Sequence, residues 1–143
     1  GAQNIPPLTY DNVKFSGGGT KTAGGPLVVN RNLTINPGVT FSGGAYGHSL
    51  YGSWVNGGSF IAGTGTNELL GSANVNIAGP TTFNMLKISK SIPTAVVTLG
   101  DPVETASLVM SRTRANRPIS GPPCLRRGPR NCPNCFTFRR RCT

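Results

Sequence analysis

The sequence has little acid and almost no histidine. It contains four Asp and Glu residues and one His among 143 residues, whereas Lys and Arg together number 14. Acid–base catalysis depends on positioned His, Asp and Glu side chains, so few groups are left for it. The sequence also lacks a run of about 18 apolar residues, which a membrane-spanning helix needs. We therefore expect a non-enzymatic protein with no cofactor and no membrane span.

Positive charge and cysteine are concentrated in the C-terminal part of the chain. Residues 1–110 hold five basic and four acidic side chains and are close to neutral. Residues 111–143 hold nine Arg, five Pro and all four Cys, with no Lys, Asp or Glu. This change of composition predicts a folded segment over 1–110, followed by an irregular Arg/Cys/Pro-rich tail over 111–143.

The tail allows several interpretations. Its like charges repel and its prolines remove backbone donors, so we expect it to be disordered, or to be a non-native segment such as an out-of-frame reading. With one CxxC pair and no His it is a weak zinc candidate, and disulfides stay open. The candidate ligands are Cys124, Cys132, Cys135 and Cys142. The candidate contacts to a polyanion are Arg126, Arg127, Arg130, Arg139, Arg140 and Arg141.

The first 110 residues alternate short apolar positions with Thr, Asn and Ser. Examples are Val13-Lys14-Phe15 and Leu33-Thr34-Ile35. A period of two residues is typical of β-strands, because successive side chains point to opposite faces. Gly and Asn separate these runs and supply tight turns. The pattern predicts an almost wholly β protein over residues 8–110, with very little helix.

Two segments resemble each other at a spacing of about 75 residues. Residues 9–16 (TYDNVKFS) align with 82–89 (TFNMLKIS), and 28–36 align with 103–111. Recurring units of short strands and Gly/Asn turns are typical of solenoids, in which stacked coils bury a shared core. We therefore favour a parallel β-helix (β-solenoid) and keep a β-sandwich as the alternative. The recurring apolar positions predicted to point inward are Val13, Phe15, Leu33, Ile35, Leu86, Ile88, Leu108 and Met110.

A series of motifs resembles a known family. The motifs follow one another as 33–36 (LTIN), 39–44 (VTFSGG), 50–60 (LYGSWVNGGSF), 62–66 (AGTGT) and 77–88 (IAGPTTFNMLKI). In this order they are similar to repeats of very large secreted, adhesin-like surface proteins of Bacteroidetes-type bacteria. The sequence departs from that pattern at 67–71 (NELLG) and at Met85. The resemblance implies an extracellular or cell-surface location, neighbouring repeats of a longer chain as partners, and no enzymatic site.

Few side chains qualify as binding candidates in the first part. Tyr46, Tyr51 and Trp54 lie close together in sequence, and exposed aromatic rings can stack on sugar rings. They are therefore the candidate contacts to a surface glycan. His48, the only His, has no nearby ligand-type residue, so we expect it on the surface.

Three functions follow from these observations. The first is a structural, non-enzymatic segment of a bacterial cell-surface or secreted repeat protein, serving adhesion or extracellular matrix. The alternative is a carbohydrate-binding or carbohydrate-cleaving β-helix. A second alternative is an Arg-rich nucleic-acid binder through the tail, although we do not favour nucleic acid as a partner.

Overall fold

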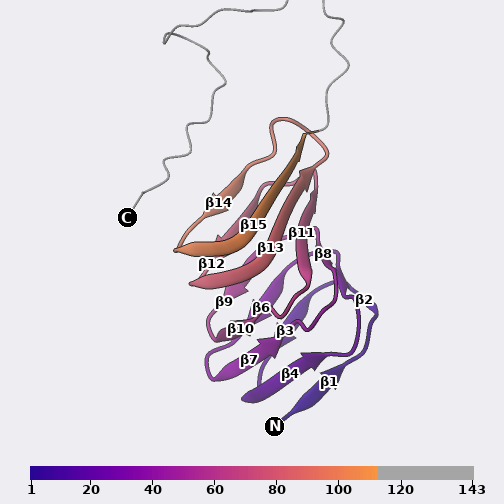
Figure 1. Ribbon diagram of the computed structural model, residues 1–143, viewed down its shortest axis with the longest axis vertical. Helices are drawn as coiled ribbons and strands as arrows, with labels where there is room; N and C mark the ends of the chain where they lie inside the picture. Colours follow the sequence, from indigo (N-terminus) through magenta and orange to yellow (C-terminus); the bar gives the residue numbers. More distant parts are fainter. Residues whose placement is uncertain (113–143) are drawn as a thin grey trace, which may run out of the picture.

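A computed structural model of the protein describes residues 1–112, with side chains described as far as Ser111. These residues form 15 β-strands and no helix. The strands coil into an elongated stack that begins at β1 and reaches β15 at the opposite end (Figure 1). Every strand pairs with its neighbours in parallel. The fold is therefore the predicted β-solenoid, and the β-sandwich alternative is wrong.

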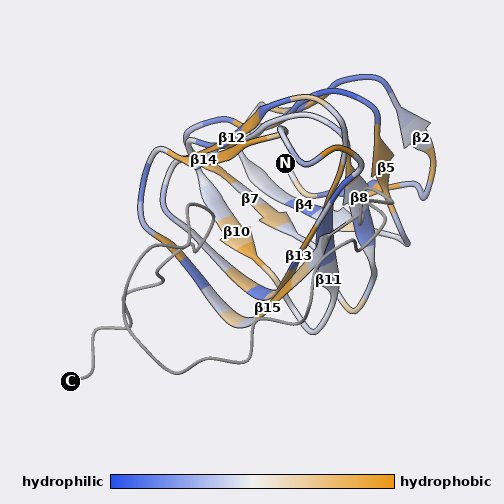
Figure 2. Ribbon diagram, turned by 90° about the horizontal axis from the view of Figure 1, so that it is seen from above, coloured by the Kyte–Doolittle hydropathy of each residue, from blue (hydrophilic) through white to orange (hydrophobic). Residues whose placement is uncertain are grey.

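Three parallel sheets form the walls of the solenoid. Sheet A contains four strands, namely β1 (Gln3–Ile5), β4 (Gly19–Ala23), β7 (Val39–Ser42) and β10 (Ser59–Ile61). Sheet B contains six strands, namely β2 (Thr9–Tyr10), β5 (Val28–Val29), β8 (His48–Leu50), β11 (Thr66–Gly71), β13 (Thr81–Lys90) and β15 (Val103–Arg112). Sheet C contains five strands, namely β3 (Val13–Phe15), β6 (Leu33–Ile35), β9 (Trp54–Asn56), β12 (Val75–Ala78) and β14 (Val97–Leu99). Seen from above, the three sheets surround one common interior (Figure 2).

One coil, not a 75-residue unit, is the structural repeat. Hydrogen bonds between adjacent coils join residues 20, 21 or 22 positions apart, as from Ser53 N–H to Asn32 Oδ1. The predicted repeat would match Val13 in sheet C with Leu86 in sheet B. It therefore does not superpose equivalent walls, and the two segments look alike because strands of every wall alternate in the same way.

The interior is apolar and contains a column of aromatic rings. Phe15 stacks on Phe41 with ring centroids 4.6 Å apart, and Phe41 lies 5.6 Å from Phe60. Phe60 in turn lies 5.6 Å from Phe83. Because Phe41 and Phe60 are register partners in sheet A, strand pairing itself brings these rings together. The column links four successive coils through one continuous core.

Most of the residues predicted to point inward are buried. Val13, Phe15, Leu33, Ile35 and Leu86 belong to the core, and Ile88 packs against it. The prediction is wrong for two other residues, since Leu108 is 39% exposed and Met110 is 63% exposed. Both lie on β15, which ends the order of sheet B in the described part of the chain and pairs only with β13. One neighbouring strand cannot cover these side chains as two neighbouring strands cover Leu33.

Polar side chains also enter the interior, contrary to a simple alternation of polar and apolar. The buried polar residues are Lys21, His48, Asn56, Asn67, Thr81 and Lys90. Asn56 is held by hydrogen bonds, because its Nδ2 donates to Pro80 O at 2.8 Å and to Thr81 Oγ1 at 3.2 Å. Such partners offset the cost of removing an amide from water.

Candidate functional site

The outer face of sheet B carries a row of polar side chains. Ser49 on β8 is the register partner of Glu68 on β11, and Glu68 is the partner of Lys87 on β13. We call Ser49, Glu68 and Lys87 the polar row. Successive strands of a sheet lie about 4.7–4.9 Å apart, so the three groups follow the long axis of the solenoid at that spacing. The row results from the register of three coils that are distant in sequence.

An ion pair occupies the middle of the polar row. Lys87 Nζ lies 2.9 Å from Glu68 Oε1, and the two side chains are 37% and 22% exposed. The Ser89 hydroxyl and then Lys87 lower the pKa of the Glu68 carboxyl, while partial burial opposes them. Ser89 Oγ makes no hydrogen bond of standard geometry, so it acts as a nearby dipole. Glu68 is therefore a carboxylate at neutral pH, held against a cation.

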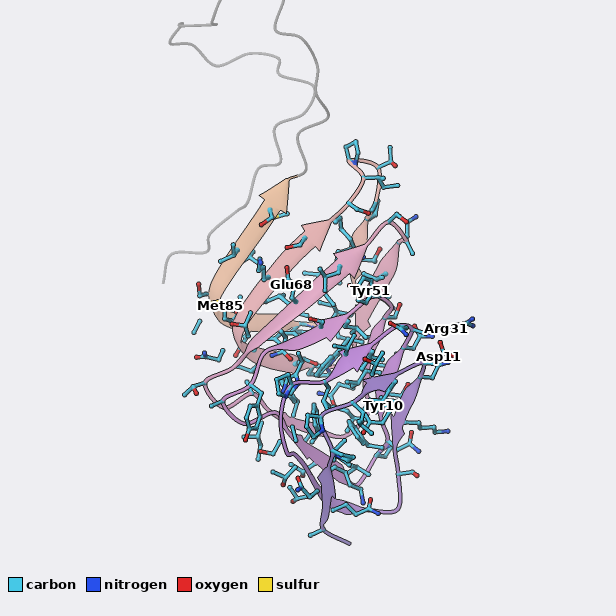
Figure 3. All side chains as sticks on the ribbon, turned by 90° about the vertical axis from the view of Figure 1, so that its right-hand side faces the viewer. Tyr10, Asp11, Arg31, Tyr51, Glu68 and Met85 are labelled. Atoms are coloured by element: carbon cyan, nitrogen blue, oxygen red, sulfur yellow. The ribbon has the colours of Figure 1, made fainter. Side chains whose placement is uncertain are left out.

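Tyr51 stands beside the polar row, directly after β8. The residue is 41% exposed. A Cβ added to Gly71 in the next coil would stand 3.2 Å from Tyr51 Cδ1, so the ring lies against the backbone of that glycine. Figure 3 shows Tyr51, Glu68 and Met85 on the side of the stack that sheet B forms. The bare backbone of Gly71 thus supports an exposed aromatic ring next to an ion pair.

A second ion pair lies nearer the N-terminal end of the solenoid. Arg31 Nε lies 3.1 Å from Asp11 Oδ1, and the side chains are 71% and 65% exposed. Figure 3 shows both residues at the edge of the stack, below Tyr51. Because both groups are well solvated, this pair is looser than the Glu68–Lys87 pair and has no exposed ring beside it in the polar row.

The predicted glycan contacts do not form one site. Tyr46 and Tyr51 are exposed, at 38% and 41%, but they flank β8 from opposite ends of the strand. The prediction is wrong for Trp54, which is only 2% exposed. Its Nε1 donates a hydrogen bond to Thr81 Oγ1 at 3.3 Å inside the solenoid. Trp54 points inward because it is the register partner of Leu33 and Ile77 in sheet C, so it cannot stack on an external sugar.

His48 is also not where the sequence predicted it. It is 6% exposed and lies inside the solenoid, beside the ring of Phe41. Its Nδ1 accepts a hydrogen bond from Leu27 N–H at 3.2 Å, so Nε2 carries the proton and donates it to Gly43 O at 2.9 Å. Burial lowers the pKa of His48, and the hydrogen bond to Gly43 opposes this shift. The neutral ring is a structural link between coils and is not available to a ligand.

A cavity of about 320 Å³ lies in the first coil. Its lining includes Ile5, Val13 and Phe15 together with Lys21. Lys21 is buried and its Nζ donates to Gly1 O at 2.8 Å. None of the side chains predicted to bind a glycan lies at this cavity.

The described residues contain no group of three or more metal-ligating side chains. The four Cys and the six Arg predicted to contact metal or polyanion lie outside the described residues, as does the tail from residue 113 onward. Within residues 1–112, no helix has the length and apolar character to cross a membrane. The polar row and Tyr51 are therefore the best-defined group of exposed, positioned side chains on the described surface.

Sequence reasoning missed the polar row. Glu68 and Lys87 are far apart in sequence and lie in the segment that departs from the resembled repeat and in the segment that follows it. A count of one coil length between the two residues is the signal that could have found the pair. Comparisons of the chain with family models, with curated proteins and with solved structures found no match.

Proposed function

We propose that the chain is a structural, non-enzymatic segment of a bacterial cell-surface or secreted repeat protein that serves adhesion or extracellular matrix. The observation that carries the proposal is the unbroken ladder of sheet C. It runs from Val13 through Leu33, Trp54 and Ile77 to Leu99, one residue per coil. Each coil is hydrogen-bonded to the next and shares its core, which supports a role as a stiff spacer.

The outward faces of the coils supply the second part of the proposal. Thr34 on β6 and Lys14 on β3, for example, lie side by side outside sheet C, while their neighbours along the strand are buried. A stiff array presents such side chains at a regular spacing. Contacts that are weak at one coil then add along the array, because binding at one coil raises the effective concentration at the next.

The location can be tested on cells that make the protein. An antibody raised against the purified full chain is applied to intact cells and to permeabilised cells, and an antibody to an intracellular protein serves as the control. We expect the antibody to label intact cells, or the chain to accumulate in the medium. Labelling only after permeabilisation, with no chain in the medium, would overturn the proposed function.

A further inference from the structure

We propose that the outer face of sheet B binds a neutral polysaccharide, with Tyr51 as the stacking platform and the polar row as the hydrogen-bonding partner. This inference rests on the proposed function only for the source of the ligand, which a surface or secreted protein meets outside the cell. The binding itself can be measured on the purified protein. The argument has three parts, which concern spacing, charge and the ring.

The spacing of the polar row suits a chain of sugar units. Ser49, Glu68 and Lys87 are register partners on β8, β11 and β13. Their strands lie about 4.7–4.9 Å apart, a distance comparable to the length of one hexose unit. A polysaccharide that follows the solenoid axis therefore meets one member of the row per sugar. The row is parallel to the long axis of the stack, so several units can bind at once (Figure 1).

The charge of the row favours a neutral ligand. Glu68 and Lys87 neutralise each other at a separation of 2.9 Å, so the face offers neither a free cation nor a free anion there. Both side chains keep part of their surface in contact with solvent. The carboxylate accepts hydrogen bonds, the ammonium donates them, and Ser49 can do both. Neighbouring hydroxyls on one sugar ring match such an adjacent donor and acceptor.

The ring of Tyr51 supplies the apolar contact. Sugar rings have C–H faces that stack on aromatic rings, and an aromatic platform combines a large contact area with low conformational freedom. Tyr51 is 41% exposed, and the glycine backbone under its ring limits the directions in which it can turn. Gly71 has φ of 79°, a conformation that other residues rarely adopt, so this support is specific to glycine.

The test measures binding of the full chain to neutral polysaccharides. The probes are laminarin, xylan and galactomannan, with alginate as the anionic comparison, and the method is isothermal titration calorimetry. Because the chain carries a net charge of +10, each titration is repeated at several-fold higher salt. We expect at least one neutral polysaccharide to bind with an affinity that salt does not change. Binding of alginate alone, lost at higher salt, would overturn the proposal.

Variants of the face locate the site. We expect Tyr51→Ala to weaken binding by about threefold to tenfold, from the loss of one aromatic contact. Lys87→Met and Glu68→Gln should each weaken it by several-fold, since each removes one partner of the ligand hydroxyls. A circular dichroism spectrum and a melting temperature for each variant show that the fold is kept. Unchanged affinity in all three variants would contradict the assignment of the site.

Matched controls lie elsewhere on the same protein. Tyr46→Ala removes a tyrosine that is 38% exposed at the other end of β8, and Asp11→Asn breaks the other ion pair. Both variants should bind as the unmodified chain does. If Tyr46→Ala were as harmful as Tyr51→Ala, the ligand would not follow the polar row. Labelling of intact cells without polysaccharide binding would refute this inference alone, whereas binding by an intracellular protein would refute the proposed function alone.

Discussion

His48 and Leu27 are joined inside the solenoid by a hydrogen bond in which the Leu27 backbone N–H donates to His48 Nδ1 at 3.2 Å. The bond connects the second coil to the third and requires a histidine that is neutral at Nδ1. A protonated ring would place two N–H groups against each other at this position. The interior therefore contains one group whose protonation opposes folding.

Stability should fall as the pH is lowered through the histidine range. The pKa of folded His48 is below its ordinary value of 6.5, so the unfolded chain binds more protons between the two values. The free energy of unfolding then rises with pH in this window and is fully regained above about 6.5. Melting temperatures measured from about pH 7 to about pH 5 should decrease, since His48 is the only histidine.

His48→Gln provides the comparison for the pH experiment. The variant lacks the titrating ring, so its melting temperature should change less between these two pH values, although it starts lower. An equally steep decrease in the variant would show that another group causes the acid sensitivity.

Two leucines with similar sequence surroundings should differ in their contribution to stability. Leu33→Ala removes a side chain that is 2% exposed and should lower the free energy of unfolding by about 2–5 kcal/mol. Leu108→Ala removes one that is 39% exposed and should change it by about 0.5 kcal/mol or less. Urea unfolding followed by the fluorescence of the single buried tryptophan, Trp54, measures both values. Equal costs would show that β15 is covered as fully as β6.

Three glycines separate backbone strain from crowding. Gly79 has φ of 83°, and an added Cβ would collide with the carbonyl oxygen of Asn56 in the preceding coil. Gly38 has φ of 77° with open space around it, and Gly47 has neither constraint. We expect Gly79→Ala to cost more than Gly38→Ala, which should cost about 1–2 kcal/mol. Gly47→Ala should be neutral or slightly stabilising. Thermal unfolding would contradict this explanation if the first two costs were the same.

The two ion pairs should differ in a double-mutant cycle. The Glu68–Lys87 pair is partly shielded and should show a coupling of about 0.2–1 kcal/mol, whereas the solvated Asp11–Arg31 pair should show almost none. The cycle uses Glu68→Gln and Lys87→Met, singly and together, with Asp11→Asn and Arg31→Met as the matched set. Urea unfolding at low and high salt gives both couplings. Equal couplings would show that shielding by the sheet has no effect.

Acid should weaken the same ion pair. The pKa of Glu68 is lowered in the folded protein, so its contribution to stability is present above the ordinary value of 4.5 and is lost as the pH falls through the folded value. The coupling measured at about pH 3 should therefore be smaller than that at about pH 7. A coupling that did not change with pH would show that Glu68 is not the titrating partner.

Local pattern was enough to predict the class of fold and much of the core. Val13-Lys14-Phe15 and Leu33-Thr34-Ile35 each read as inward, outward, inward, and the structure shows this burial. The candidate site was not predictable to the same extent. Tyr51 and Trp54 are three residues apart, yet the ring of one is exposed and the other is buried, because a corner after β8 separates them.

Sequence by itself determined that residues 8–110 form short strands with a shared apolar interior, because alternation and glycine turns are local properties of the chain. Only the tertiary structure decided which residues meet. Coil lengths of 20 to 22 residues set the register, and the register places Glu68 against Lys87, His48 against Leu27 and Trp54 between Leu33 and Ile77. A change of one residue in one coil would turn those side chains to the opposite face, since successive residues of a strand alternate between faces.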